Sequence, residues 1–286
     1  MLALPFTNPP HPLLIEPIVR NALLEDLGRA GDITTDAIIP PEAKARAVIA
    51  AREPGTVTGL VAADLAFKLI DPAVTLGPRA PDGSHVEKGD VIAELEGPAR
   101  AILSAERVAL NFLGHLSGIA TATHAISVRI GGTKARIICT RKTTPGLRVL
   151  EKYAVRCGGG LNHRFGLDDA VLVKDNHIQA AGGVANAVKM LRGRLGPMVK
   201  IELEVDTLEQ LEEALACGID AILLDNMPPE TMKRAVAIAK GRATLEASGG
   251  VTLERARAIA ESGVDYMSSG ALTHSVRNLD VGLDFL

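Results

Sequence analysis

The spacing of apolar residues changes character about one third of the way along the chain. In residues 14–27 leucines and isoleucines recur three and four positions apart, which predicts an amphipathic helix. Short β-like runs separated by turn residues follow up to Leu103, and residues 86–95 have the pattern of a hairpin around a Gly-Asp turn. This first part is therefore predicted to be α+β, with helices against a largely antiparallel sheet.

A long helical segment comes next, and after it the rhythm changes. Residues 104–130 are rich in Ala, Leu and Ile and predict one long helix or two joined helices. Short apolar runs then alternate with amphipathic segments that begin with Thr or Pro and end with Gly, as helix starts and ends require. Six such runs are predicted as strands, at residues 135–140, 170–175, 199–205, 221–226, 243–249 and 265–271. Repeated βα units predict a parallel sheet covered on both faces, either an incomplete barrel or a doubly wound open sheet.

Composition narrows the class of protein. Hydrophobic residues make up 47% of the 286 residues and aromatic residues only 2%, so the core must consist mainly of small aliphatic side chains. Aromatic stacking platforms for nucleic-acid bases are not expected. A net charge of −3 also gives no global basic field toward nucleic acid or anionic membranes, so an anion would need a local cluster of cations.

The cellular location is predicted to be the cytoplasm. The cysteines Cys139, Cys157 and Cys217 are widely spaced, which favours reduced thiols over a disulfide framework or a zinc site. Residues 1–18 lack a basic start and are interrupted by prolines, so we interpret them as an irregular lead-in and not as a signal peptide. No run of about 18 apolar residues predicts a membrane span.

Charged side chains follow the predicted strands at their carboxyl ends. Arg141 and Lys142 follow the first strand, Lys174 the second, while Glu204 lies in the third and Asp225 ends the fourth. A single charge of this kind is ordinarily a solvated residue or a helix cap. Repetition on successive strands favours an active site at this rim, since side chains from several strands converge there in βα barrels.

Two further patterns indicate an anionic ligand. Gly-rich turns at 248–250 and 269–271 follow the last two strands and offer backbone N–H groups of the kind that bind phosphate. Asn162, His163 and Arg164 stand together before a buried strand, and Arg is the expected receptor for small carboxylates. P-loop, GxGxxG and HExxH patterns are absent from the sequence.

The motifs resemble those of the quinolinate phosphoribosyltransferase family. The most specific are TRKTTPG at 140–146 and NHRxGLxDxxLxKDNH at 162–177, and the likeness extends in order over essentially the whole chain. The resemblance implies an α/β fold, an incomplete βα barrel of about seven strands with an N-terminal α/β sandwich domain. The expected domains are 1–116, to which 277–286 returns, and 117–276. A homodimer with a shared active site is also implied.

The resemblance also implies roles for single residues. Lys142, Glu204 and Asp225 would be catalytic, and the two carboxylates would hold the ribose hydroxyls or Mg²⁺. Quinolinate would be bound by Arg107 of the partner subunit and by Thr140, Arg141, His163, Arg164 and Lys174. The phosphoribosyl group would contact Lys142, Glu204, Asp225, Ser248, Gly249, Gly250, Ser269, Gly270, Ala271 and His274.

The implied reaction joins quinolinate to phosphoribosyl pyrophosphate and releases nicotinate mononucleotide, pyrophosphate and carbon dioxide, as a step of NAD biosynthesis. Mg²⁺ is expected with the pyrophosphate, and no organic cofactor. Three alternatives stay open at this point. They are a paralogous branch of the family linked to molybdenum-transport loci, a barrel aldolase or isomerase with a Schiff-base lysine, and a sensor that binds the same ligands without turnover.

Overall fold

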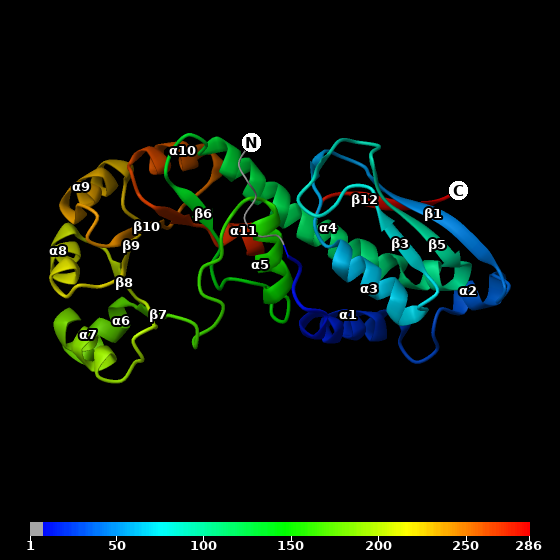
Figure 1. The fold of residues 1–286 in the computed structure, drawn as a ribbon, viewed down its shortest axis with the longest axis horizontal. Coiled ribbons are helices and arrows are strands. Elements are labelled where there is room, and N and C mark those ends of the chain that lie inside the picture. Colours follow the sequence, from blue (N-terminus) through cyan, green and yellow to red (C-terminus); the bar gives the residue numbers. More distant parts are fainter. Residues whose placement is uncertain (1–7) are drawn as a thin grey trace. The chain divides into compact units, whose positions relative to one another are not determined.

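The structure, a computed structural model, describes residues 8–286 (Figure 1). Of the irregular lead-in predicted at residues 1–18, residues 1–7 lie outside this range, and the prediction is wrong for residues 12–18, which belong to a helix because their apolar residues continue the helical spacing. The described chain forms two compact units. The first contains the residues up to His124 together with Thr143–Gly159 and Ala271–Leu286, and the second contains Ala125–Lys142 and Gly160–Gly270. None of the described helices is long and apolar enough to cross a membrane.

The first compact unit contains a four-stranded sheet in the order β12-β1-β5-β3 and a two-stranded sheet, β2-β4. Its strands are β1 (Lys44–Ala51), β2 (Gly55–Thr56), β3 (Thr75–Pro78), β4 (His85–Val86), β5 (Val91–Pro98) and β12 (Val281–Phe285). Its helices are α1 (Pro12–Leu27), α2 (Ile33–Ile38), α3 (Leu60–Ile70), α5 (Arg148–Cys157) and α11 (Ala271–His274). The four-stranded sheet is antiparallel, as the sequence pattern predicts.

The hairpin predicted around Gly89 does not form. β4 pairs with β2, whereas β5 pairs with β1 and β3. The turn is instead bonded to the end of β1, because the Gly89 N–H donates to Ala51 O and the Ala51 N–H donates to Asp90 O. A turn sequence shows where the chain reverses, but it does not show which strand its neighbours pair with.

The long segment after residue 98 forms a single helix, α4 (Ala99–Arg129), and not two. It is 31 residues long and passes from the first compact unit into the second. Small residues on it lie against the C-terminal chain: a Cβ on Gly118 would overlap Arg277 O, and one on Gly114 would come within 2.9 Å of Leu279 O. These glycines allow close backbone approach.

The second compact unit is a six-stranded parallel sheet in the order β6-β11-β10-β9-β8-β7. The strands are β6 (Arg136–Ile138), β7 (Val171–Val173), β8 (Ile201–Val205), β9 (Ala221–Asp225), β10 (Thr244–Ser248) and β11 (Tyr266–Ser268). The helices are α6 (Asp175–Ala181), α7 (Val184–Arg192), α8 (Leu208–Ala216), α9 (Pro229–Ala239) and α10 (Leu253–Glu261), and Figure 1 shows α8, α9 and α10 along the outer side of the strands.

All six strands predicted from the sequence are present, and the sheet is an open barrel. The resemblance implied about seven strands. Among the described residues the place of a further strand is taken by an isolated parallel bridge between Ile138 and Leu161. A single bridge is too short to count as a strand, because the chain turns at once into the polar loop at 162–164.

Local chemistry explains where the helices of this unit begin. Thr207 Oγ1 accepts a hydrogen bond from the Gln210 N–H, and Gln210 Oε1 accepts one from the Thr207 N–H, which is a complete capping box at the start of α8. Thr252 caps α10 by accepting from the Arg255 N–H. Because α8 and α10 each start after a strand and a short turn, the carboxyl ends of β8 and β10 are followed at once by short loops at one rim of the sheet.

Candidate active site

The carboxyl ends of the parallel strands lie at one edge of the sheet. Asp225 at the end of β9 is paired with Ser248 at the end of β10, and Ser248 is paired with Ser268 on β11. Glu204 on β8 lies opposite Leu223, two residues before Asp225 on the neighbouring strand. The strand register therefore brings the two predicted site carboxylates, Glu204 and Asp225, and the Gly-rich turn after β10 to the same rim.

The two rim carboxylates have different partners. Glu204 Oε2 accepts from Lys174 Nζ at 2.7 Å, and this ion pair joins the ends of β7 and β8. Asp225 Oδ2 accepts from Asn226 Nδ2 at 2.7 Å. A carboxylate can accept about four hydrogen bonds, so both groups keep acceptor capacity for ligand hydroxyls or a cation.

Arg141 and Arg164 place two positive charges near each other. Burial and then the charge of Arg141 lower the pKa of the Arg164 guanidinium, although Glu202 and Asp169 act in the opposite direction. Arg164 Nη1 also donates to Ala170 O at 2.9 Å, which fixes the guanidinium. Two mutually repelling cations in a partly buried position are typical of a site for an anion with more than one charge.

The segment Thr140–Lys142 forms a tight turn after β6. Thr140 Oγ1 accepts from the Lys142 N–H at 3.0 Å, and the Lys142 side chain is exposed. Thr140 and Arg141 are half-buried. This turn directs one long cation into solvent, where it can approach a bound ligand.

The Gly-rich turn after β10 needs its glycines. Gly249 has a φ of +89° and Gly250 a φ of +61°, in the region that other residues rarely adopt. A Cβ on Gly249 would overlap the side chain of Asn226, whose N–H donates to Ser248 O at 2.9 Å. After β11, Ser269 N donates to Ile138 O at 3.1 Å, and Gly270 follows.

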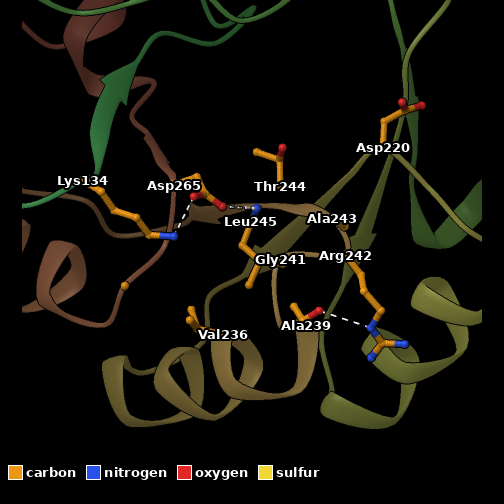
Figure 2. A pocket seen from close by; sticks show the side chains of 11 residues that line it. Lys134, Asp220, Val236, Ala239, Gly241, Arg242, Ala243, Thr244, Leu245 and Asp265 are labelled. Carbon is orange, nitrogen blue, oxygen red and sulfur yellow. Dashed lines mark hydrogen bonds and ion pairs between the residues drawn. The ribbon is translucent and has the colours of Figure 1, made fainter.

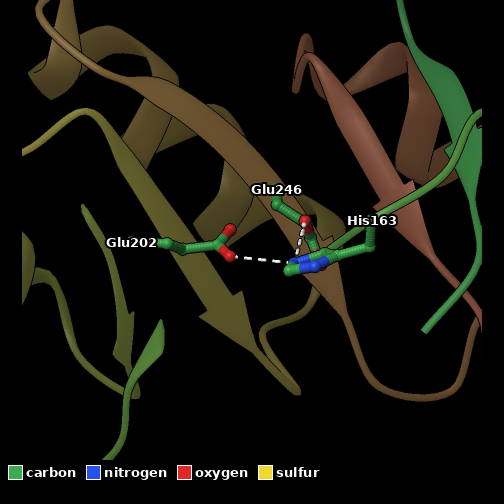
Figure 3. Close-up of side chains that lie close together, drawn as sticks. All are labelled: His163, Glu202 and Glu246. Atoms are coloured by element: carbon green, nitrogen blue, oxygen red, sulfur yellow. Dashed lines mark hydrogen bonds and ion pairs between the residues drawn. The ribbon is translucent and has the colours of Figure 1, made fainter. Parts of the chain in front are cut away.

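A buried cluster below this rim was not among the predicted site residues, apart from His163. Figure 3 shows the carboxyl groups of Glu202 from β8 and Glu246 from β10 both directed at the His163 ring. His163 Nε2 lies 2.9 Å from Glu202 Oε2 and 3.5 Å from Glu246 Oε2. Burial, reinforced by the charge of Glu202, raises the pKa of Glu246 to about 8. A signal was available in the sequence, because Glu246 interrupts an otherwise apolar strand and Glu202 shares a strand face with Glu204.

Three of the predicted site residues belong to the first compact unit. Arg107 is exposed on α4 and borders a cavity of about 570 Å³ together with Glu25 and His115. Ala271 and His274 lie on α11, and His274 Nδ1 is 2.6 Å from Ser275 Oγ.

Another cavity, of about 300 Å³, lies at the amino ends of the same strands (Figure 2). Its charges are paired within the protein: Lys134 Nζ is 2.7 Å from Asp265 Oδ1, and Asp265 Oδ2 accepts from the Leu245 N–H at 2.9 Å. Arg242 donates to the carbonyls of Ala239 and Ile238 at the end of α9. These charges have internal partners, so this cavity is not our candidate site.

Comparisons with known proteins identify the family. Family models match along most of the chain: "Quinolinate phosphoribosyl transferase, N-terminal domain" at residues 32–117 and "Quinolinate phosphoribosyl transferase, C-terminal domain" at residues 119–284.

Among the relatives, the nicotinate-nucleotide pyrophosphorylase [carboxylating] of Mycobacterium leprae is 46% identical, over 93% of this chain and 95% of that protein. The crystal structure of NadC from Streptococcus pyogenes is 41% identical, with a TM-score of 0.93 over 98% of this chain and 99% of that one. The nicotinate-nucleotide pyrophosphorylase from Francisella tularensis has a TM-score of 0.94 at 38% identity, over 99% of each chain. The chain described here belongs to the quinolinate phosphoribosyltransferase family.

Proposed function

We propose that this chain transfers the phosphoribosyl group of phosphoribosyl pyrophosphate to quinolinate, with loss of carbon dioxide, to form nicotinate mononucleotide for NAD biosynthesis. The observation that carries this proposal is the pair of guanidinium groups that parallel segments bring to one rim: Arg141 follows β6, and Arg164 follows the parallel Ile138–Leu161 bridge. Quinolinate has two adjacent carboxylates, which offset both positive charges. Membership of the family supports the same substrate.

Quinolinate is held by cations in this proposal. Arg141, Arg164 and Lys174 face its carboxylates, with Thr140 and His163 beside them and Arg107 supplied by the partner subunit. Charge-assisted hydrogen bonds are shorter and stronger than neutral ones, and the planar guanidinium matches a carboxylate in a bidentate way. Lys174 Nζ is ion-paired with Glu204, so in this proposal it serves as a charge and not as a Schiff-base nucleophile.

The phosphoribosyl group lies along the other strand ends. Glu204 and Asp225 contact the ribose hydroxyls, and Lys142 reaches both substrates from its exposed turn. The 5-phosphate is bound by backbone N–H groups and hydroxyls of the two Gly-rich turns, where the start of α10 also favours negative charge. The proposed phosphate contacts are Ser248, Gly249, Gly250, Ser269, Gly270, Ala271 and His274.

The reaction then follows from the charges. The bond from C1 of the ribose to pyrophosphate breaks, and the positive charge that develops on the ring is stabilised by the carboxylates of Glu204 and Asp225. The pyridine nitrogen forms the new bond to C1. The resulting pyridinium accepts the electron pair when the bond to the 2-carboxylate breaks, and carbon 2 takes up a proton. The arginines orient quinolinate throughout, which removes the entropic barrier to attack.

Mg²⁺ fits the residues at this rim. Glu204 and Asp225 supply the hard oxygen ligands that Mg²⁺ prefers, and each retains acceptor capacity beyond its present partner. When bound, the ion neutralises negative charge on the leaving pyrophosphate. No organic cofactor takes part in this proposal.

We further propose a homodimer in the cytoplasm, in which Arg107 of each chain completes the site of the other. Arg107 is exposed on α4 in the first compact unit, and a partner can reach it there. Arg107→Ala and Lys174→Ala proteins, each nearly inactive, are expected to regain partial activity after subunit exchange. Mixed dimers that stay inactive would contradict a shared site.

The substrate test compares quinolinate with nicotinate at saturating phosphoribosyl pyrophosphate. Nicotinate leaves at least one cation without a partner, and a charged hydrogen bond is worth roughly 1.5–3 kcal/mol, so kcat/KM should favour quinolinate by at least ~10²-fold. Carbon dioxide and nicotinate mononucleotide are the measured products. Comparable values for the two acids contradict the proposal, as does ligand binding without turnover. Trapping of a covalent adduct by borohydride would support an aldolase instead.

A further inference from the structure

The proposed function leaves two buried carboxyl groups, Glu202 and Glu246, without a role. Both are buried, on β8 and β10, which are separated in the sheet by β9, and both approach one nitrogen of His163 (Figure 3). The side chains are 15% exposed for His163, 11% for Glu202 and 4% for Glu246. Removing two carboxyl groups from water is expensive, so an arrangement of this kind needs a reason beyond packing.

The hydrogen bonds of the His163 ring determine its protonation. The backbone N–H of Arg164 donates to His163 Nδ1 at 2.7 Å, so Nδ1 presents a lone pair. The proton of the neutral ring is therefore on Nε2, which donates to Glu202 Oε2 at 2.9 Å. Both nitrogens are thus engaged inside the protein.

This tautomer restricts what the cluster can bind. A His and two Glu within reach of one point can hold a metal ion. However, Nε2 carries the proton here and offers no lone pair to a metal, while Nδ1 is used by Arg164. For the same reason the ring cannot donate to a substrate carboxylate without losing one of its present bonds.

The cluster does connect to the cationic loop at 162–164. Asn162 Oδ1 accepts from Cys139 Sγ at 3.4 Å, His163 is bonded to Glu202, and Arg164 is fixed through its backbone N–H and through Nη1 to Ala170 O. Each of the three consecutive residues at 162–164 is thus held by a hydrogen bond of its own. A rigid support is needed there, because Arg164 is desolvated and repelled by Arg141.

We propose that Glu202 and Glu246 are positioning residues that hold the neutral His163 ring, and through it place the Arg164 guanidinium for a carboxylate of quinolinate. The identity of the ligand, quinolinate, rests on the proposed function. In this proposal His163 acts by holding Arg164 in place, and not by carrying a positive charge. Glu246 takes part as a neutral carboxyl, since burial and the charge of Glu202 raise its pKa to about 8. Its Oε1 has no hydrogen-bond partner among the described residues.

Substitutions at His163 test whether its ring acts as a neutral support for Arg164 or as a positive charge that binds quinolinate. His163→Gln keeps a neutral donor toward Glu202, whereas His163→Lys keeps a positive charge and loses the acceptor for Arg164. We expect the KM for quinolinate to rise about tenfold or more for the Lys variant and clearly less for the Gln variant, with the KM for phosphoribosyl pyrophosphate unchanged in both. The reverse order overturns the proposal. His85→Gln, an exposed histidine on β4, is the matched control.

Substitutions at Glu246 test the carboxyl pair. Gln has the donor and acceptor of a protonated Glu, so Glu246→Gln should stay within about threefold of wild type, whereas Glu246→Ala should raise the KM for quinolinate about tenfold with a smaller change in kcat. Equal losses in both variants, or a loss confined to kcat, contradict a positioning role. Glu230→Gln on the exposed face of α9 is the control.

A direct measurement covers the case in which a variant fails to fold. Nitrogen-15 NMR of the imidazole rings in the intact wild-type protein reports the tautomer of each of the seven histidines, and the His163 signal is the one lost in His163→Gln. We expect the neutral Nε2–H form, with and without quinolinate. A doubly protonated ring overturns the proposal. This result does not depend on turnover, so failure of the proposed function is recognised separately, from the product assay.

Discussion

The two ends of the parallel sheet in the second compact unit differ in how their charged side chains are paired. At the amino ends, each carboxylate meets a lysine and a backbone N–H: Asp265 pairs with Lys134 and the Leu245 N–H, and Asp220 with Lys200 and the Ile201 N–H. Toward the carboxyl ends, the Glu204–Lys174 ion pair stands beside like charges: the charge of Arg141 acts on Arg164, and below the rim the charge of Glu202 acts on Glu246.

We interpret the amino ends as the end that stabilises the fold and the carboxyl ends as the end that binds the proposed ligand. Paired charges that also bond strand N–H groups reduce the free energy of the folded chain without any partner. Like charges raise it until something binds between them or a proton is retained. Natural proteins depart from local consistency mainly at functional sites, and the like charges named above lie at or below the rim that bears the proposed site.

Asp225 and Asp220 stand at opposite ends of β9 and allow the sharpest test. Asp225→Ala should lower kcat by about 10²-fold or more, because charge stabilisation of the ribose is lost, with little change in the KM for quinolinate. Asp220→Ala should keep kcat within about threefold of wild type. Steady-state kinetics of the two variants measure both. Equal losses of kcat would remove the distinction between the two ends.

Glu246→Gln should stabilise the protein in a pH-dependent way. The pKa of Glu246 is raised from its ordinary value of 4.5 to about 8, so the unfolded carboxyl ionises first and stability is lost as pH rises between these values. Gln does not ionise, so the gain in the free energy of unfolding should be near zero at pH 4.5 and reach roughly 2 kcal/mol near pH 8. Proton sharing between Glu246 and Glu202 keeps this gain below the value that the full pKa shift would give. Thermal unfolding at a series of pH values measures it; a gain that shrinks with pH would contradict this assignment.

Asp220→Asn should show the opposite sign. Desolvation alone would raise the pKa of Asp220, but the bonds from Lys200 and the Ile201 N–H outweigh it and lower the pKa below 3.8. The stabilisation is therefore present above the unfolded pKa and is lost as the pH falls through the folded one. The group is partly exposed, so we expect a loss of about 1 kcal/mol at neutral pH that fades toward pH 3. Urea unfolding at both pH values measures the difference, and an equal loss at both would point to packing instead.

Much of the second compact unit could be predicted from the sequence. Apolar runs bounded by Thr, Pro and Gly predict all six strands, and the charged residues after them predict which end of the sheet carries the site. Both predictions succeed because the spacing of apolar side chains and the chemistry of helix caps are local properties of the sequence. The roles of single residues came from the resemblance and remain proposals. The Glu246 carboxyl was overlooked, because its significance depends on two residues more than forty positions away in the sequence.

The first compact unit shows the limits of local information. The Gly89 turn did not form a hairpin, since pairing with β1 and β3 is decided by distant residues. Nor does the sequence show that α5 belongs to the first compact unit. In the structure Tyr153 of α5 donates to Asp82 Oδ2 at 2.8 Å, and Asp82 Oδ1 accepts from the N–H groups at the start of α3. A contact between residues 71 positions apart produces no periodic pattern in the sequence from which it could be predicted.

The pairing of β12 with β1 also bears on how the chain is made. β1 lies between β5 and β12, and Arg52, directly after β1, is ion-paired at 2.7 Å to Asp284 of β12, which lies 232 positions further along the chain. During synthesis, the N–H and C=O groups along one edge of β1 thus have no partner strand until β12 leaves the ribosome, after the second compact unit. The four-stranded sheet is begun before that unit and completed after it, and its open edge is where nascent chains can associate wrongly.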